Sequence, residues 1–431
     1  MRLSRTFEDY FFSTKEIERT NTLVWARWLK GSSHHPEAPD ASGLTLPVFL
    51  KGHKSLVGHA LKAIHHGDYE PFPAILTKIF ADKERPYMRP AWIDRWILAH
   101  LGRLYGELSE PRLHSRVFSY RRGVGQHTVL RELSSYVALK KSTYVVRGDI
   151  SEFGETLDHE AVSHDFHETV EPGSCGRKLF QSLCRYPFTL EGRLANLIRG
   201  LPMGSHLQLV AENLYLRSLD ERLSHFRDGF YARFGDDIIA AHPELEVAIE
   251  MERITREAVA ARGLRLNLKK TERLKLCAPS DSCRLIVDVG HMDYRFSTRY
   301  LGRDVTHDGR LLLPLEKYRA LDTFFSSQLN SITKKLPEEL TLDQRARRLC
   351  QALRSLLGAV ENNSLLGIRA LVTEITDARQ LAQLDRRLSE LVVSRVFNRP
   401  FRKSFFRDFP PQRLREFGLE SLTHLRRVGR L

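Results

Sequence analysis

The spacing of hydrophobic and polar positions changes along the chain, and each change predicts a different kind of element. From Leu56 to Leu108 apolar residues recur at helical spacing, although prolines interrupt the run. Residues 116–150 contain the β-type runs RVFSY and STYVV around a helical segment at 127–140. Beyond Leu313 the spacing is almost entirely helical. The segments between are expected to form a helix-loop-helix region at about 156–225, a helix at 244–262 and short strands at about 264–302.

The stretch YARFGDDIIA has the pattern of two short strands joined by a tight turn. Residues 231–234 and 238–241 alternate in polarity and size, and Gly235-Asp236 falls where a hairpin would turn. The carboxylates of Asp236 and Asp237 would then stand at its tip. An acidic hairpin turn is a common structural feature, so this stretch by itself leaves two interpretations open, a solvated turn and half of a metal site.

A third carboxylate favours the metal site. The run TYVVRGDI is apolar and ends in Asp149 and Ile150, as expected of a buried strand. If that strand lies beside the hairpin, Asp149 meets Asp236 and Asp237. Three converging carboxylates need a divalent cation, and hard oxygen ligands select Mg²⁺ or Mn²⁺. Two such ions are suited to nucleotidyl transfer, in which they activate a 3′-hydroxyl and stabilise the leaving pyrophosphate.

The overall composition narrows the partners. The 431 residues favour two or three subdomains. The net charge of +14 favours polyanions, nucleic acid first and an anionic membrane second, although an ordinary basic surface explains it equally well. No apolar run approaches the roughly 20 residues that span a bilayer, and no signal peptide is apparent. We therefore expect a cytoplasmic protein that does not enter a membrane.

The five cysteines are few for this length, and none forms a CxxC pair. They indicate reduced intracellular thiols and no disulfide framework. The histidines have no partners at zinc-binding spacing, which argues against a structural zinc.

Several blocks of sequence, taken in order, resemble the reverse transcriptases, above all the bacterial enzymes related to group II introns, retrons and antiphage defence enzymes. Each block is weak by itself, but their order and spacing make the resemblance specific over roughly residues 85 to 300. The blocks are RPAWIDRWI (89–97), VFSYRRGVGQHT (117–128), DISEFGETLDH (149–159), GLPMGSHLQLVAENLYL (200–216), YARFGDD (231–237), GLRLNLKKTE (263–272) and VDVGHMDYRF (287–296).

This resemblance implies a fold of the α+β class with the right-hand polymerase architecture. Four parts are expected along the chain: an N-terminal segment at 1–50, fingers at 51–145, a palm with an antiparallel sheet at 146–300, and a helical thumb with a helical C-terminal extension at 301–431.

The resemblance also implies roles for individual residues. It assigns catalysis to Asp149, Asp236, Asp237 and Lys270, and metal binding to Asp149, Ile150, Asp236 and Asp237. It assigns nucleotide binding to Arg121, Phe153, Gly154, Met203 and Gly204, and nucleic-acid binding to Ser205, Arg122, Gly290 and His291. Lys270 would neutralise or protonate the leaving pyrophosphate, and Arg121 would bind the triphosphate.

The residues alone leave simpler interpretations of these positions open. Lys270 also fits the solvated start of a helix, and Arg121 fits an ordinary surface arginine. Ser205 fits a helix N-cap, a role that is compatible with nucleic-acid binding.

Four positions depart from the family pattern. The residue five past Asp149, usually a bulky aromatic that excludes the ribose 2′-hydroxyl, is Gly154. Met203 replaces the usual Gln, Gly235 replaces the more common Ala, and Glu155 stands where Asp is frequent. We expect sugar discrimination to be weakened, or to come from Phe153 or Tyr120.

The function that the resemblance implies is RNA-directed DNA synthesis with two Mg²⁺ ions, or Mn²⁺ in their place, in antiviral defence. The expected partners are an RNA template or a non-coding RNA, the DNA product, deoxynucleoside triphosphates, and a partner protein or a second copy of the chain. Three alternatives stay open: template-independent or protein-directed DNA synthesis, RNA polymerase activity, and a non-catalytic RNA-binding protein with a polymerase-like fold.

Overall fold

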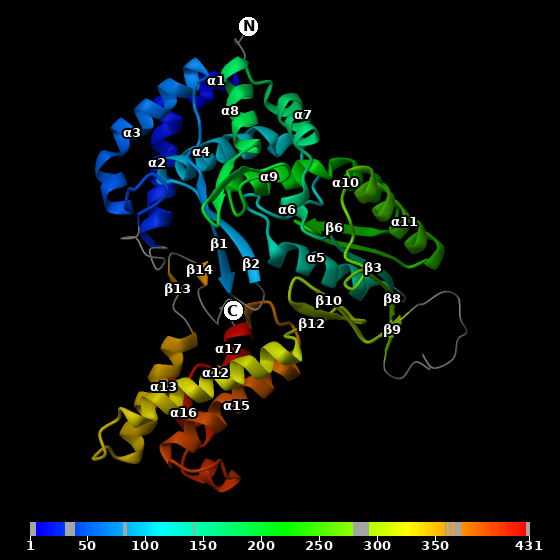
Figure 1. The fold of residues 1–431 in the computed structure, drawn as a ribbon. Helices are drawn as coiled ribbons and strands as arrows, with labels where there is room; N and C mark the ends of the chain where they lie inside the picture. The colour runs from blue at the N-terminus through cyan, green and yellow to red at the C-terminus, as the bar shows by residue number, and fades with distance from the viewer. Residues whose placement is uncertain are drawn as a thin grey trace. The chain divides into compact units, whose positions relative to one another are not determined.

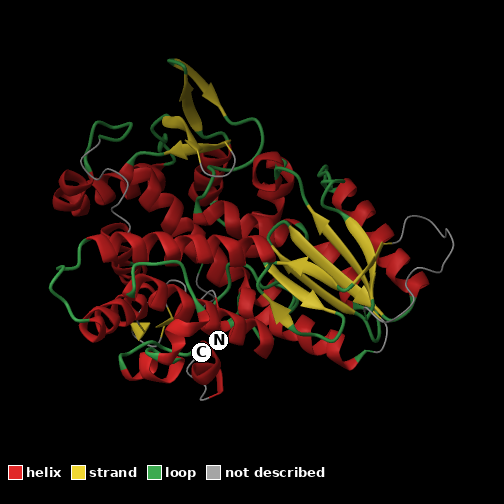
Figure 2. Cartoon of the chain, turned by 90° about the horizontal axis from the view of Figure 1, so that it is seen from below, coloured by secondary structure: helices red, strands yellow, loops and turns green. Residues whose placement is uncertain are grey.

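The computed structural model describes residues 6–30, 39–80, 84–140, 143–278, 293–357, 360–361, 364–365 and 372–427. The chain divides into two units, the first made of residues 1–129 with 144–273 and the second of residues 130–143 with 274–431. In Figure 2 helices (red) predominate and strands (yellow) gather in separate sheets. Within the described ranges, no helix is both long and apolar enough to cross a membrane.

The first unit contains most of the described helices, the four-stranded sheet and three strands of the five-stranded sheet. Its helices are α1 (Phe7–Phe11), α2 (Thr14–Lys30), α3 (Leu46–His66), α4 (Trp92–Ser109), α6 (Phe153–Thr156), α7 (His159–Val170), α8 (Ser174–Cys184), α9 (His206–Tyr215), α10 (Arg217–Ser224) and α11 (Leu245–Ala261). Its strands are β1 (Ala74–Phe80), β2 (Glu84–Arg89), β3 (Thr143–Asp149), β4 (Pro187–Leu190), β5 (Arg193–Asn196), β6 (Phe230–Phe234) and β7 (Asp237–His242). Helix α5 (Gln126–Leu139) and strand β8 (Glu272–Leu276) carry the chain from one unit to the other.

Helix α4 lies at the centre of the core of the first unit. Its residues Trp96, Leu101 and Tyr105 are fully buried. At Gly102 the helix closely approaches α9, where a β-carbon would lie 2.6 Å from the backbone nitrogen of Leu207. A side chain at this position would push the two helices apart, so the glycine sets how close α9 can lie to α4.

The hairpin predicted at residues 231–241 is present in the structure. Strands β6 and β7 are antiparallel, with Phe234 opposite Asp237, and the two-residue turn Gly235-Asp236 joins them. Gly235 has a φ of +65°, the left-handed conformation that favours glycine in such turns. Strand β3 lies on the other side of β7, and α10 and α11 pack on this sheet (Figure 1).

Two hairpins were missed by the sequence-based predictions. Strands β1 and β2 occupy part of the run from Leu56 to Leu108 that was expected to be helical, and β4 and β5 lie inside the expected helix-loop-helix region. The run AILTKIF of β1 is short and rich in β-branched residues, and a run of this length cannot be assigned by periodicity alone. The segment RVFSY was also assigned wrongly, because it makes only an isolated bridge between Val117 and Arg233.

Other predictions of secondary structure are confirmed. Helices α5 and α11 match the segments expected at 127–140 and 244–262, and most of the C-terminal third is helical. The remaining elements of the second unit are β9 (Asp293–Arg295), β10 (Ser297–Tyr300), β11 (Arg303–Thr306), β12 (Leu311–Leu312), α12 (Leu315–Lys334), α13 (Leu342–Leu357), β13 (Val360–Glu361), β14 (Ser364–Leu365), α15 (Ala378–Val396), α16 (Pro411–Glu416) and α17 (Leu422–Arg427).

The second unit has a core of its own. Leu329, Leu349, Leu353 and Val392 from three of its helices are fully buried. The basic, aromatic-rich segment RPFRKSFFRDF (residues 399–409) contributes to this core, since its Phe405 stacks on Phe397 with ring centroids 4.3 Å apart. These aromatic side chains are therefore used in packing.

Candidate active site

The three aspartates expected to bind metal lie on neighbouring strands. Asp149 ends β3 and is the register partner of Asp237, which begins β7. The backbone nitrogen of Ile150 donates to the carbonyl oxygen of Asp236 at 3.2 Å, so the turn is tied to the end of β3. Ile150 is buried and its side chain is apolar, so only its backbone carbonyl oxygen has the chemistry of a metal ligand. The juxtaposition of Asp149 with the hairpin is the arrangement that the sequence predicted.

The three carboxylates differ in their surroundings. Asp149 is 7% exposed, Asp237 is half-buried and Asp236 is exposed. Burial, together with the negative charges of Asp236 and Asp149, raises the pKa of Asp237 to about 6. A carboxylate whose ionisation is opposed by like charges gains from a bound cation.

Lys270 belongs to the same site. Its ammonium nitrogen lies 2.6 Å from Oδ1 of Asp149, and its side chain is half exposed. The backbone nitrogen of Asn267 donates to the carbonyl oxygen of Asp149 at 2.7 Å, which fixes the loop that carries Lys270 beside β3. The neighbouring Lys269 is exposed.

The donor set fits hard divalent cations, because carboxylate oxygens are the ligands that Mg²⁺ and Mn²⁺ prefer. Within the described part of the chain, however, no three or more His, Cys, Asp and Glu side chains are already gathered as a ligand set. One carboxylate oxygen of Asp149 is paired with the ammonium group of Lys270. Binding would therefore require these side chains to rotate toward the ion.

Buried contacts that the sequence did not predict hold the hairpin in place. Arg233 donates through Nε and Nη2 to both carboxylate oxygens of Asp220, at 2.8 and 2.7 Å, and the two side chains are 0% and 1% exposed. The hydroxyl of Ser119 accepts from the backbone nitrogen of Gly235 at 2.9 Å and donates to Asn213 at 2.7 Å. The turn is thus anchored to α10, to α9 and to the segment before Tyr120.

The Gly-Leu-Pro block forms a turn that leads into α9. Ser205 is the N-cap of this helix, and its hydroxyl accepts from the backbone nitrogen of Gln208 at 3.2 Å. Gly204 has a φ of +74° and Met203 packs against the core of the first unit. Gly200 closely approaches α6, since a β-carbon there would lie 2.7 Å from the carbonyl oxygen of Gly154.

Phe153 and Tyr120, the two candidates for sugar discrimination, lie in different surroundings. Phe153 is 4% exposed and packs edge-on against Tyr215, so its ring is part of the core. Tyr120 is 45% exposed, and its hydroxyl oxygen would lie 3.7 Å from a β-carbon at Gly235. Burial, together with the nearby charges of Glu212 and Asp236, raises the pKa of Tyr120 to about 12. Tyr120 therefore lies at the turn that carries the aspartates.

Glu212 is a further acidic residue at this site that sequence reasoning missed. It is buried in α9, and its burial together with the charge of Asp236 raises its pKa to about 7. The available signal was a charged residue inside the apolar block LVAENLYL.

The two arginines of the fingers block have different partners. The Arg121 guanidinium bonds to Glu110 Oε1 through Nε at 2.9 Å and Nη2 at 2.7 Å, and also to two backbone carbonyls. The side chain of Arg122 is 74% exposed and bonds to Glu107 at 3.3 Å. Gly290 and His291, expected to contact nucleic acid, lie outside the described residues.

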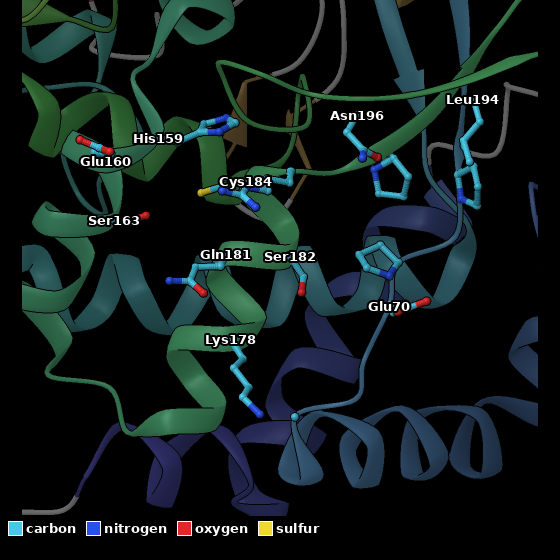
Figure 3. A pocket seen from close by; sticks show the side chains of 15 residues that line it. Glu70, His159, Glu160, Ser163, Lys178, Gln181, Ser182, Cys184, Leu194 and Asn196 are labelled. Atoms are coloured by element: carbon cyan, nitrogen blue, oxygen red, sulfur yellow. The ribbon is translucent and has the colours of Figure 1, made fainter.

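A cavity of about 900 Å³ opens elsewhere in the first unit (Figure 3). His159 and Glu160 from α7, Lys178 and Gln181 from α8, and Asn196 from β5 are among the residues that line it. None of the residues expected to act in catalysis or binding lines this cavity.

Comparison with known families agrees with this geometry. Residues 83–305 match the reverse transcriptase (RNA-dependent DNA polymerase) family. This span is more than half of the 431 residues, and the chain belongs to that family. Together with the mixture of helices and sheets, it confirms the expected α+β polymerase class.

The solved structures that resemble the chain include two yeast telomerases. One is telomerase from Candida albicans in complex with a fragment of telomeric RNA, with a TM-score of 0.46 and 11% identity over 81% of this chain and 63% of that chain. The other is apo telomerase from Candida tropicalis, with a TM-score of 0.46 and 8% identity over 87% of this chain and 73% of that chain. This chain thus spans less than two thirds of the Candida albicans protein. No curated protein matches it.

Proposed function

We propose that this chain is an RNA-directed DNA polymerase whose nucleotidyl-transfer site contains Asp149, Asp236 and Asp237. The observation that carries the proposal is the register of β3 on β7, in which Asp149 lies opposite Asp237. In the reaction, the 3′-oxygen of a primer bonds to the α-phosphorus of a deoxynucleoside triphosphate. The bond between that phosphorus and the departing pyrophosphate breaks, and the proton of the 3′-hydroxyl passes to solvent water.

The residues of the site have different proposed roles in this reaction. The three aspartates would hold two Mg²⁺ ions, which when bound activate the 3′-hydroxyl and neutralise the leaving group. Lys270, which already contacts Asp149, provides a positive charge and a proton beside the reacting phosphates. Arg122, with an exposed side chain, is available to phosphate oxygens, while Arg121 would have to exchange Glu110 for them.

The proposed partners follow from charge and from family membership. A net charge of +14 favours a nucleic-acid template, and the reverse transcriptase family supports RNA in that role. A role in antiviral defence, with a non-coding RNA, a partner protein or a second copy of the chain, is part of the proposal and rests on the resemblance to bacterial defence enzymes.

Primer extension on a defined RNA template, with labelled deoxynucleotides and Mg²⁺, tests this function. We expect full-length DNA from the natural protein and none from the double variant Asp236→Asn, Asp237→Asn. The matched control is Asp228→Asn, which removes a carboxylate just before β6. Asp228 has a φ of +59°, a conformation that asparagine accepts equally well, so this change leaves the backbone undisturbed.

Each alternative function gives a different result in the same assay. A defined DNA product made without any RNA would replace templated synthesis by template-independent or protein-directed synthesis. Extension with ribonucleotides alone would indicate an RNA polymerase. A protein that binds RNA tightly but extends nothing, and whose cellular activity survives the double substitution, would be a non-catalytic RNA-binding protein.

A further inference from the structure

Gly154 stands where the family usually has a bulky aromatic residue that excludes the ribose 2′-hydroxyl, called here the sugar gate. In this protein other side chains fill the space beside Gly154. Gly154 lies in α6 and is buried. A β-carbon at Gly154 would lie 1.5 Å from Nε2 of Gln208 and 2.5 Å from Oε1 of Glu212. The space that a side chain at position 154 would take is therefore filled by two polar side chains of α9.

Hydrogen bonds fix this pair of side chains. Oε1 of Gln208 accepts from the backbone nitrogen of Gly204 at 2.7 Å, and its Nε2 donates to Oε1 of Glu212 at 3.0 Å. Both side chains belong to residues that are only 7% exposed. A polar pair held in this way, with the amide orientation defined by its partners, is pre-organised for recognition.

The pair also lies beside the turn that carries the aspartates. Nη1 of Arg233 is shared between the carbonyl oxygens of Glu212 and Gly235, at 3.5 and 3.4 Å. The next residue of α9, Asn213, bonds to Ser119, which in turn holds the backbone nitrogen of Gly235. Gln208 and Glu212 thus connect α6, where the sugar gate is missing, to the turn that carries Asp236.

We propose that Gln208 and Glu212 are the sugar-specificity residues of this polymerase, and that they accept a ribose hydroxyl by hydrogen bonding where an aromatic ring would exclude it. This inference rests on the proposed polymerase function. An aromatic ring at position 154 would reject a ribonucleotide by steric overlap. A carboxylate and an amide can instead satisfy the extra hydroxyl, so the ribonucleotide loses that penalty. The substrates of the site then include both ribonucleoside and deoxyribonucleoside triphosphates.

The ratio of kcat/KM for GTP to that for dGTP on one RNA template tests the proposal. We expect the two values to lie within about tenfold of each other in the natural protein. Glu212→Ala and Gln208→Ala should each lower the GTP to dGTP ratio by about tenfold, the effect of one lost neutral hydrogen bond. Glu246→Ala, which removes an exposed carboxylate from α11, is the control and should leave the ratio unchanged.

A triple variant introduces the aromatic ring that the family usually has at position 154. In the triple variant Gly154→Phe, Gln208→Ala, Glu212→Ala the aromatic side chain takes the space that the pair vacates. We expect the GTP to dGTP ratio to fall by at least 100-fold. Thermal unfolding shows which variants fold. If Glu212→Ala does not fold, Glu212→Gln, which keeps the size of the side chain and one hydrogen-bond acceptor, replaces it in the comparison.

The outcomes separate this inference from the polymerase proposal. Strict dGTP use by the natural protein, or a ratio that Glu212→Ala and Gln208→Ala leave unchanged, overturns the inference while the polymerase stands. If neither nucleotide is incorporated, the polymerase proposal fails, and the test moves to the Kd values of GTP and dGTP measured by fluorescence. A Kd ratio that changes with Glu212→Ala then supports the pair as a sugar-recognition site, and a constant ratio overturns it.

Discussion

Arg233 and Asp220 form a doubly hydrogen-bonded ion pair that is almost completely buried, and it anchors the hairpin that carries Asp236 and Asp237 to α10. Breaking such a pair leaves an uncompensated charge in the core. We expect Arg233→Met to lower the free energy of unfolding by about 3–5 kcal/mol. Urea denaturation measures the change.

A double variant shows how much of that cost comes from the orphaned charge. Combining Arg233→Met with Asp220→Leu removes both charges, and we expect it to be more stable than Arg233→Met alone. Arg253→Gln on the exposed surface of α11 should change stability little, because exposed ion pairs contribute little. If Arg233→Met proved as stable as Arg253→Gln, the anchoring role would be wrong.

Lys270 and Lys269 are adjacent lysines with different expected roles. Only Lys270 contacts Asp149, so Lys270→Ala should lower kcat about 10²–10⁴-fold, the range of a general acid. Lys269→Ala removes a charge of the same kind one residue away and should lower kcat much less. Single-turnover kinetics at saturating nucleotide makes the comparison, and equal losses would favour a general electrostatic effect over a specific proton donor.

Arg121 and Arg122 offer a second pair of neighbours. The Arg121 guanidinium is held by Glu110 and by backbone carbonyls, whereas Arg122 is exposed. We expect Arg122→Ala to raise the KM for nucleotide or the Kd for template, with stability unchanged. Arg121→Ala should lower the melting temperature. A rise in KM with Arg121→Ala at unchanged melting temperature would restore Arg121 as the direct ligand of the triphosphate.

Gly102 makes the close packing of α4 on α9 testable. In Gly102→Ala the new methyl group would lie 2.6 Å from the Leu207 backbone, so we expect a loss of about 1–3 kcal/mol. Gly58→Ala in α3 is the matched control, because nothing lies within 4 Å of its β-carbon position. In the control we expect a gain of about 0.5–1 kcal/mol from helix propensity. A similar gain at Gly102 would contradict the close approach.

The part of the site that follows from local rules could be predicted from the sequence. Alternation in residues 231–234 and 238–241 with Gly235 at the turn defines a hairpin, and the apolar run before Asp149 defines a buried strand. The anchors Asp220 and Ser119 depend on packing between segments distant in sequence, and no local pattern identifies them.

The missing sugar gate illustrates the same limit. The sequence identified Gly154 as a departure and suggested Phe153 or Tyr120 as a substitute. Only the fold shows that Phe153 is in the core and that Gln208 and Glu212, more than fifty residues later, fill the space at Gly154. Residue spacing along one chain cannot reveal which helix covers a glycine.

The pKa of Asp237 predicts how pH affects stability and metal binding. Its folded value of about 6 lies above the ordinary value of 3.8, so the protonated form is favoured by folding. The contribution of Asp237 to the free energy of unfolding is therefore fully present below pH 3.8 and is lost as the pH rises through 6. In the absence of divalent cations we therefore expect Asp237→Asn to be more stable than the natural protein at pH 7, by roughly 1–3 kcal/mol, and the difference to vanish near pH 4.

Divalent cations should reverse this order, because a proton and a cation compete for Asp237. Mn²⁺ affinity, measured by calorimetry, is expected to fall as the pH drops below about 6 in the natural protein and to be weak at every pH in Asp237→Asn. Adding Mn²⁺ at pH 7 should raise the melting temperature of the natural protein and of the Asp228→Asn control, and change that of Asp237→Asn little. An equal gain in all three proteins would place the bound ion away from Asp237.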